Sequence, residues 1–376
     1  MKTRPTIYLH VGTAKTGTSA LQHFIGKNLN RFAEYGFYYP ETGRVDNCHH
    51  GIAFYWDNHD VFKQRFDVQE DQLSRLADEL YANQDKHILI SSECLLLSTV
   101  NWKDLLSAFP HQNIRIIIYL RRQDSFLASR YRELVKGNQI ILPPAEWIET
   151  NFYPNEYLGI LNNLLSYVGK NNIIVRVYEQ QQFVGGSIFS DFCNIFSIPL
   201  TNDFVISDKN FNPHLSLNAL EFNRLVNTVF DDRSSPYIFN SVLTQFSLKE
   251  KPEDNLAFRN HGLFSPCKRW EILAACENVN NTIAREYLGR ENGRLFYVQP
   301  PNPDELWEPY PGLSLEKAEE IIRFIFKKQP DMAVRLYHAL KEAVSDEPYL
   351  QNAKEILLTP LSKVIPQYLV KNFRKK

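Results

Sequence analysis

Residues 6–21 read Thr-Ile-Tyr-Leu-His-Val-Gly-Thr-Ala-Lys-Thr-Gly-Thr-Ser-Ala-Leu. Residues 7–11 form an apolar run, which predicts a buried strand. Beyond a turn rich in glycine and threonine, apolar residues recur at helical spacing, at Leu21, Phe24, Ile25, Leu29 and Phe32. A strand, such a turn and a helix N-terminus together form an anion site, because unpaired backbone N–H groups and the positive end of the helix dipole converge there.

Eight consecutive residues of this turn are expected to bind the anion: Gly12, Thr13, Ala14, Lys15, Thr16, Gly17, Thr18 and Ser19. The two glycines let the backbone approach the ligand, the hydroxyl groups of Thr16, Thr18 and Ser19 add donors, and Lys15 adds a mobile positive charge. The turn is not a Walker A loop, which has its lysine directly after the second glycine. Here Thr18 occupies that position and Lys15 lies inside the loop.

The composition limits the class of protein. A chain of 376 residues, 44% of them hydrophobic, is long enough for one large domain or a domain with an appendage. The net charge of −1 argues against a nucleic-acid-coating surface. The five cysteines show no paired metal-ligand spacing, so no metal site is expected. No apolar run approaches the ~18 residues of a membrane span, and strand one follows the N-terminus directly, which predicts a cytoplasmic protein.

Three further buried strands are expected at residues 86–92, 113–120 and 172–178, with helices between them. Strands that alternate with helices predict an α/β fold with a mainly parallel central sheet covered on both faces. Ligands of such sheets bind at the carboxyl ends of the strands. Glu93, Arg121 and Tyr178 follow or end three of these strands, so we expect them to converge with Lys15.

The order G-x-x-K-T-G-T-S in residues 12–19 resembles the 5′-phosphosulfate loop of sulfotransferases that use 3′-phosphoadenosine 5′-phosphosulfate (PAPS). In that family the lysine reaches the oxygen between phosphate and sulfuryl group. The R-x7-S spacing from Arg121 to Ser129 resembles the family's 3′-phosphate site, where an arginine fork and a hydroxyl hold one phosphate. Tyr178, in Val-Tyr-Glu, resembles the tyrosine near the adenine.

Residues 208–216 look like the N-x-x-x-S segment of the bacterial-type enzymes, which adds Lys209, Asn212 and Ser216 to the expected nucleotide ligands. The resemblance covers roughly residues 1–300. It implies a P-loop-like three-layer α/β/α fold, PAPS as the donor without a required metal, and transfer of a sulfuryl group to an acceptor hydroxyl. Residues 301–376, after the Pro-Pro-Asn-Pro stretch at 300–303, are expected to form a C-terminal helical extension, with helices at 315–328 and 331–344.

In-line sulfuryl transfer needs a group that stabilises the leaving oxygen and a base that takes the acceptor proton. Lys15 suits the first role. Glu93 is the leading base, because it follows a buried strand and its apolar neighbours are expected to raise its pKa. His49, His50 and His59 are the alternatives. Helix capping by Glu93 and loop packing by the histidines remain open as purely structural explanations.

Two other functions remain open: a P-loop nucleotide kinase or NTPase, and a non-catalytic module that binds 3′,5′-adenosine bisphosphate (PAP). Residues 35–66 carry aromatic and histidine residues in a long irregular connection, so we expect an acceptor-binding loop there. Aromatic rings stack on sugars, which makes a glycan or glycolipid the expected acceptor. The basic residues 371–376 suggest at most peripheral contact with a membrane.

Overall fold

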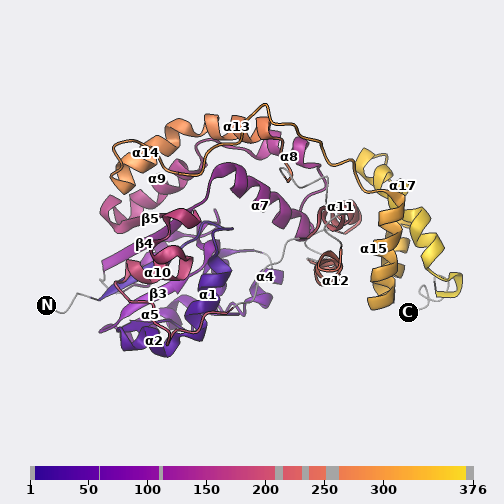
Figure 1. The fold of residues 1–376 in the computed structure, drawn as a ribbon. Helices are drawn as coiled ribbons and strands as arrows, with labels where there is room; N and C mark the ends of the chain where they lie inside the picture. The colour runs from indigo at the N-terminus through magenta and orange to yellow at the C-terminus, as the bar shows by residue number, and fades with distance from the viewer. Residues whose placement is uncertain are drawn as a thin grey trace. The chain divides into compact units, whose positions relative to one another are not determined.

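The computed structural model describes residues 5–58, 60–109, 113–207, 215–230, 237–250 and 262–369 of the chain. It divides into two compact units (Figure 1). The first contains residues 1–126, 153–211 and 272–300, and the second contains residues 127–152, 212–271 and 301–376. In the described residues, no helix is both long enough and apolar enough to cross a bilayer.

The first unit is built on a five-stranded sheet with the order β2-β3-β1-β4-β5, in which every pairing is parallel. The strands are β1 (Thr6–His10), β2 (Phe37–Tyr38), β3 (His87–Ser91), β4 (Asn113–Leu120) and β5 (Ile173–Val177). In the central strand, Ile7 lies beside Ile88 on one side and Ile114 on the other. The predicted parallel sheet is confirmed, and β1 lies where the strand order reverses, at the position where open α/β sheets bind ligands.

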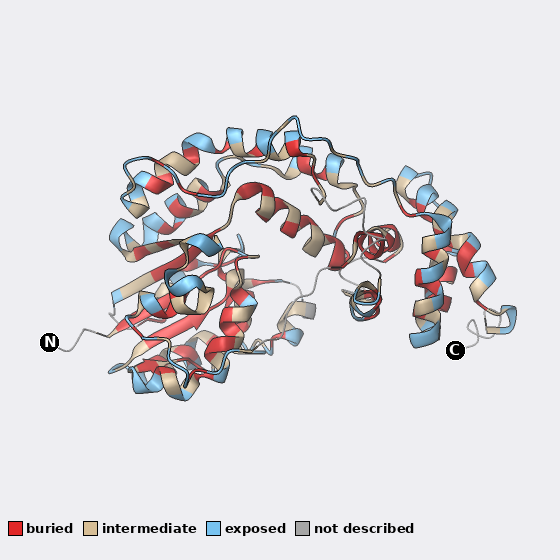
Figure 2. Cartoon of the chain, viewed as in Figure 1, coloured by how far each residue is buried: buried red, intermediate tan, exposed pale blue. Residues whose placement is uncertain are grey.

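Helices cover both faces of this sheet, which makes three layers, and the strands between them are buried (Figure 2). Alternate strand residues such as Tyr8, Leu89 and Ile117 pack into one core with α1 (Thr18–Lys27), α2 (Leu29–Glu34) and α10 (Ile188–Ile195). Elsewhere α9 (Glu156–Val168) and α14 (Glu277–Leu288) contact β5 and each other. The predicted three-layer α/β/α class is therefore confirmed.

Residues 35–66 are less irregular than expected. They contain β2, α3 (His50–Ala53), a 3-10 turn at Phe54–Trp56 and α4 (Asp60–Arg65). The segments α5 (Gln72–Ala82) and α6 (Trp102–Ser107) complete the part of the unit before β4. These short elements hold the connection in a defined shape beside the carboxyl end of β3, because His49 N–H donates to Ser91 O at 2.8 Å.

The second unit is helical in its described residues. It comprises α8 (Pro144–Asn151), α11 (Leu217–Val226), α12 (Asn240–Ser247), α15 (Leu315–Lys328), α16 (Pro330–Glu342) and α17 (Pro348–Val364), with parts of α7 (Gln123–Lys136) and α13 (Pro266–Ala275). The last three helices pack on one another, and α15 and α17 also contact α11. Residues 301–376 share their unit with residues 127–152 and 212–271, and the expected separate domain of residues 1–300 stays a prediction.

Candidate functional site

The loop between β1 and α1 has a backbone that requires glycine. Gly12 and Gly17 have φ angles of 95° and 78°, in the left-handed region. A Cβ atom on Gly12 would lie 3.0 Å from Cβ of Glu93, and one on Gly17 would lie 2.7 Å from Cδ1 of Ile188. The same Cβ on Gly17 would also lie 3.1 Å from the Tyr178 ring. The glycines therefore bring the loop against both Glu93 and Tyr178.

Hydrogen bonds fix the loop to β4. The Thr13 N–H and hydroxyl both donate to Tyr119 O, at 2.9 and 3.1 Å, and the Thr16 hydroxyl donates to Thr13 O. The hydroxyl protons of Thr13 and Thr16 are thus used inside the protein. The buried Thr16 side chain thereby holds the turn closed, and its contact with the anion stays a prediction.

The N-terminus of α1 leaves backbone donors for an anion. Gly17 is the N-cap and offers no side-chain acceptor, and the first intrahelical bond runs from Leu21 N–H to Gly17 O. The N–H groups of the first turn, which include those of Thr18 and Ser19, have no acceptor within the helix. Ser19 and Ala14 are exposed and Lys15 is half-buried. The loop thus combines backbone donors, the helix dipole and one lysine, as the sequence predicts for an anion site.

Glu93 begins a 3-10 turn (Glu93–Leu96) directly after β3, and two side chains of α1 bind its carboxylate. The Thr18 hydroxyl donates to Oε1 at 3.1 Å, and the Gln22 amide donates to Oε2 at 2.9 Å. Burial alone would raise the pKa of Glu93. The nearby His50, a backbone N–H and the Gln22 and Thr18 donors outweigh burial and leave that pKa below its usual value.

This result corrects one expectation. The predicted rise in the pKa of Glu93 is wrong, because burial is outweighed by His50, a backbone N–H and the donors of α1. The Thr18 hydroxyl donates to Glu93, and its contact with the anion stays a prediction. Gln22 escaped the sequence analysis, although it lies one turn after Thr18 on the same face of the helix, and that spacing is the signal that could have identified it.

The histidines near Glu93 have different environments. His49 is fully buried, accepts a hydrogen bond at Nδ1 from Ser91 N–H, and makes another through Nε2 to Pro40 O. Burial lowers its pKa to about 4. Both ring nitrogens of His49 are held by backbone groups, so it has less support as a base than Glu93, and its catalytic role stays a prediction. His59 lies outside the described residues.

His50 remains a second candidate base. Its Nδ1 shares a hydrogen bond with Ser92 Oγ at 2.8 Å. Burial lowers its pKa, which the adjacent Glu93 charge partly offsets. His10, which the sequence analysis did not select, ends β1 with its Nδ1 at 2.8 Å from Ser91 Oγ and its Nε2 without a partner among the described residues. Burial lowers the pKa of His10 to about 4, so its ring is neutral at neutral pH.

Arg121 joins the loop to Tyr178. Its Nη1 donates to Lys15 O at 2.9 Å, its Nε donates to Ser125 Oγ at 2.9 Å, and its guanidinium lies 5.7 Å from the centre of the Tyr178 ring. Burial lowers the pKa of the Arg121 side chain. The Tyr157 hydroxyl, another feature absent from the sequence analysis, donates to Arg121 O at 2.6 Å. The expected convergence of Lys15, Glu93, Arg121 and Tyr178 at one sheet edge is thus visible in their contacts.

The remaining predicted nucleotide ligands are Ser129, Lys209, Asn212 and Ser216. Ser129 is a buried residue of α7 in the second unit, whereas Arg121 belongs to the first, so their joint phosphate contact stays a prediction. Lys209 and Asn212 lie outside the described residues, as do residues 371–376. Ser216 caps α11 by accepting a hydrogen bond from Ala219 N–H at 3.2 Å.

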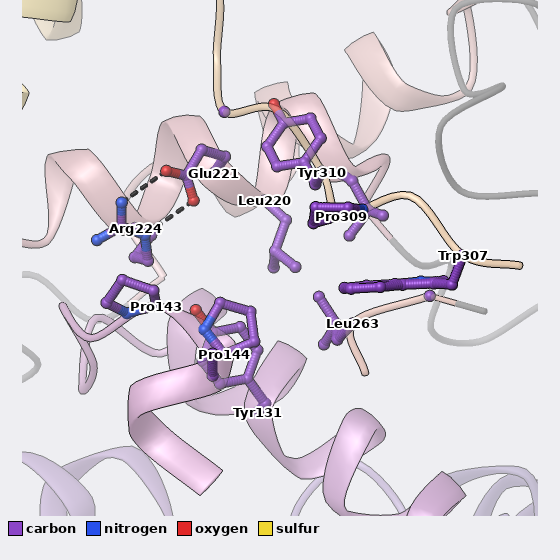
Figure 3. Close-up of a pocket in the computed structure, with 14 residues that line it drawn as sticks. Tyr131, Pro143, Pro144, Leu220, Glu221, Arg224, Leu263, Trp307, Pro309 and Tyr310 are labelled. Atoms are coloured by element: carbon purple, nitrogen blue, oxygen red, sulfur yellow. Dashed lines mark hydrogen bonds and ion pairs between the residues drawn. The ribbon is translucent and has the colours of Figure 1, made fainter. Parts of the chain in front are cut away.

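A cavity of about 250 Å³ lies within the second unit (Figure 3). Apolar, aromatic and proline side chains dominate its lining, with Tyr131, Trp307 and Tyr310 among them. Glu221 and Arg224 of α11 also line it, and they form a two-point ion pair with distances of 2.8 and 2.6 Å. Because this pair satisfies its own charge, the cavity presents a mainly apolar surface.

Comparison with known proteins places few limits on the function. No protein-family model matches the chain. An uncharacterized protein of Archaeoglobus fulgidus is 27% identical over 210 residues, which cover 54% of this chain and 55% of that protein. The chain therefore spans about half the length of the curated relative it matches. A crystal structure of a sulfotransferase from Alicyclobacillus acidocaldarius aligns over 67% of this chain and 98% of its own, with a TM-score of 0.36 and 16% identity. Similarity at this level establishes no shared activity.

Proposed function

We propose that this chain is a PAPS-dependent sulfotransferase that moves a sulfuryl group to an acceptor hydroxyl of a glycan or glycolipid. The observation that carries the proposal is the set of hydrogen bonds around the loop. The Thr18 hydroxyl donates to the Glu93 carboxylate, and the Arg121 guanidinium donates to the backbone carbonyl of Lys15. One edge of the sheet thereby holds an anion loop, two cationic side chains and a carboxylate, which are the groups that this reaction needs.

The residues present suit a phosphosulfate donor. The N-terminus of α1 and Lys15 offer donors and positive charge to a 5′-phosphosulfate. Arg121 uses Nε and Nη1 in its hydrogen bonds, and its other N–H groups are available for a phosphate oxygen. When bound, PAPS supplies the activated sulfuryl group. The ring of Tyr178, which lies beside both Gly17 and Arg121, suits stacking on a base.

The side chains of this site fit two roles in sulfuryl transfer. The acceptor hydroxyl gives up a proton, and the Glu93 carboxylate, which is ionised at neutral pH because of its lowered pKa, can take it. Each Glu93 oxygen accepts one described hydrogen bond and keeps a further lone pair for that proton. Lys15 stabilises the negative charge that forms on the released phosphate.

The kinase or NTPase alternative has less support from these residues. Such enzymes place lysine after the second glycine and use an Asp near a strand end to hold Mg²⁺. Here Thr18 follows Gly17 and bonds Glu93, while β3 leads into Ser92 and β4 into Arg121. The non-catalytic PAP-binding module differs from the proposal only in turnover, so an activity measurement decides between them.

Calorimetry with PAP and with ATP tests the nucleotide class. We expect PAP to bind far more tightly than ATP and without Mg²⁺, because the loop and Arg121 provide contacts for two separate phosphates. Equal or tighter ATP binding, or a requirement for Mg²⁺, would contradict the proposal. Sulfur-35-labelled PAPS incubated with a panel of sugar, lipid and phenolic acceptors then tests turnover. PAP binding without transfer to any acceptor would identify the non-catalytic module.

The neighbouring arginines provide a matched control for this calorimetry. Arg121→Ala should weaken PAP binding by about 1.5–3 kcal/mol, because a charge-assisted contact to phosphate is lost. Arg122 is bound to Asp124 at 2.8 Å and donates to Gln299 O at 2.9 Å, so its side chain is already occupied. Arg122→Ala should therefore lower stability and leave the PAP affinity unchanged. Equal loss of PAP affinity in both variants would remove Arg121 from the nucleotide site.

A further inference from the structure

A polar cavity of about 530 Å³ lies in the first unit, within the ~300–1,000 Å³ range of small-molecule sites. Residues 41–45 form one wall, the face of α5 from Gln72 to Glu79 forms another, and Phe66 and Asp67 complete it. Residues 41–45 and Phe66 lie in the segment 35–66, which the sequence predicts as an acceptor-binding loop, whereas the lining residues of α5 carry no motif. Their shared cavity appears only when the connection after β2 folds against α5.

Gln72 carries an unsatisfied hydrogen-bond donor in the wall of this cavity. The residue is 2% exposed, and its Oε1 accepts from Gln69 N–H at 3.2 Å. Its Nε2 has no partner in the part of the chain that the structure describes. A Cβ added to Gly43 or to Gly51 would lie 2.9 Å from this nitrogen, so the amide lies beneath these two glycines. An unpaired buried donor is unfavourable, and a ligand oxygen that reaches this nitrogen would satisfy it.

The charges around the cavity define the ligand class. Arg44 and Arg75 supply donors, and Glu41, Asp67 and Asp78 supply acceptors. Because a hydroxyl group both donates and accepts, a molecule with several hydroxyls can pair with this mixed lining. Acidic residues outnumber basic ones, so an anionic ligand is disfavoured. These features fit an uncharged sugar.

One wall is already ordered for such a ligand. The Glu79 carboxylate accepts hydrogen bonds from Tyr38 O–H at 2.6 Å and from the N–H groups of Glu41 and Thr42 at 2.7 and 2.9 Å. These three bonds fix the backbone of residues 41 and 42 to α5. A preordered wall reduces the entropy that a ligand loses by fixing the protein.

The cavity also contacts the segment that contains His50, close to Glu93. The ring of Phe66, which lines the cavity, packs edge-on against His50 with 5.2 Å between ring centres. His50 in turn bonds Ser92, the residue before Glu93. Gly51 N–H donates to Gly43 O at 3.1 Å. A continuous set of contacts within one unit therefore connects the cavity with the proposed base.

We propose that this cavity binds one uncharged sugar unit of the acceptor and so determines acceptor specificity, an inference that rests on the proposed sulfotransferase function. Gln72 supplies the buried donor, and Asp78 supplies an acceptor at the exposed side. The sugar unit that carries the reacting hydroxyl is its neighbour in the glycan. The cavity selects the acceptor by hydroxyl pattern, with no covalent role of its own.

The test uses the full chain and simple sugars without nucleotide. Methyl β-D-glucopyranoside, methyl α-D-mannopyranoside and methyl β-D-galactopyranoside are the neutral probes, with D-glucuronate as the anionic probe. Saturation-transfer NMR and calorimetry should show binding of at least one neutral glycoside and binding of glucuronate about tenfold weaker or less. Absence of binding by all neutral glycosides, or tighter binding of glucuronate, overturns the proposal.

Variants locate the binding. Gln72→Glu keeps the shape and the acceptor for Gln69 N–H but replaces the donor with a charge, so glycoside affinity should fall about tenfold or more. Asp78→Ala, at an exposed position that leaves folding intact, should also weaken binding. Gln84→Glu, the same change at an exposed residue outside the cavity, should have no effect. Unchanged glycoside affinity in both cavity variants overturns the proposal.

Parallel measurements with PAP and labelled PAPS separate this inference from the proposed function. Glycoside binding that depends on Gln72, without PAP binding or sulfuryl transfer, keeps the sugar subsite and rejects the sulfotransferase. Sulfuryl transfer to a glycan with the same acceptor KM in wild type, Gln72→Glu and Asp78→Ala keeps the sulfotransferase and rejects the subsite.

Discussion

Burial raises the pKa of Glu93, but His50, a backbone N–H and the donors of α1 bring it below its usual value. Replacing Glu93 with glutamine keeps the size of the side chain but removes its ability to take a proton. Turnover of Glu93→Gln with labelled PAPS should fall by roughly 10²–10⁴, the usual contribution of a positioned general base. PAP affinity measured by calorimetry should persist. Because the pKa of Glu93 is lowered, the acid limb of the wild-type rate profile should lie below pH 4.5, and it should vanish in the variant.

His50→Ala is the comparison for this experiment, since the charges of His50 and Glu93 affect the pKa of each other. It should keep most of the turnover and raise the acceptor KM, because His50 packs against Phe66 at the cavity wall. Near-normal turnover in Glu93→Gln with collapse in His50→Ala would make His50 the base.

The identity of these residues was predictable from the sequence, but their environments were not. Glu93 was selected because it follows a buried strand, a local feature. Its pKa depends on Thr18 and Gln22, which only the fold brings near. His49 and His50 are adjacent in sequence, yet one has both ring nitrogens bound to backbone groups and the other faces Ser92 and Glu93. Sequence patterns report which residue types are present and do not report where each side chain points.

At the scale of elements, the loop between β1 and α1 needs glycine for two reasons: a left-handed backbone and the lack of room for a Cβ atom. Gly36, which lies outside the loop and precedes β2, tests the first reason alone. It has φ 80° and nothing within 4 Å of an added Cβ, so Gly36→Ala changes only the backbone strain. It should lower the free energy of unfolding by about 1–2 kcal/mol, the cost of a left-handed alanine. Gly17→Ala adds a clash with Ile188 and Tyr178, so urea unfolding should show a larger loss and calorimetry a weaker PAP affinity. Equal losses at the two positions would mean that both neighbours move aside at no cost.

The long regular elements were predictable because their signals are local. The strand at 113–120 and the helices at 156–168 and 315–328 match the structure residue for residue, since each is a continuous apolar run or an amphipathic repeat. The two-residue β2 is too short to show a period. Residues 266–288 form two helices, α13 and α14, which divide at Cys276, where no glycine or proline signals the break.

Across the whole molecule, buried neutral histidines make stability depend on pH. Burial lowers the pKa of both His10 and His49 from 6.5 to about 4. The unfolded chain takes up their protons near pH 6.5, whereas the folded chain resists until about pH 4, so stability falls as the pH drops through this window. Each residue accounts for up to about 3 kcal/mol. Urea midpoints between pH 7 and 4 should decline less steeply in His10→Gln than in wild type, and parallel curves would show that His10 does not contribute.

The division into units was only partly visible in the sequence. The cluster of prolines at 300–303 is a local signal, because proline interrupts regular structure. The packing of α15 and α17 on α11 involves residues about a hundred positions apart, and no local pattern indicates such a contact.

The central position of β1 has a consequence for synthesis of the chain. Both partners of β1 lie later in the sequence, since β3 pairs with one side and β4 with the other. While the ribosome makes the chain, the apolar residues of β1 therefore leave the exit tunnel long before any strand can cover them. The anion loop is completed later than the pairing of β1 with β3, because the Thr13 N–H donates to the backbone carbonyl of Tyr119, near the end of β4. Until β3 emerges, the strand that begins the candidate site is unpaired and apolar, the kind of nascent segment that chaperones bind.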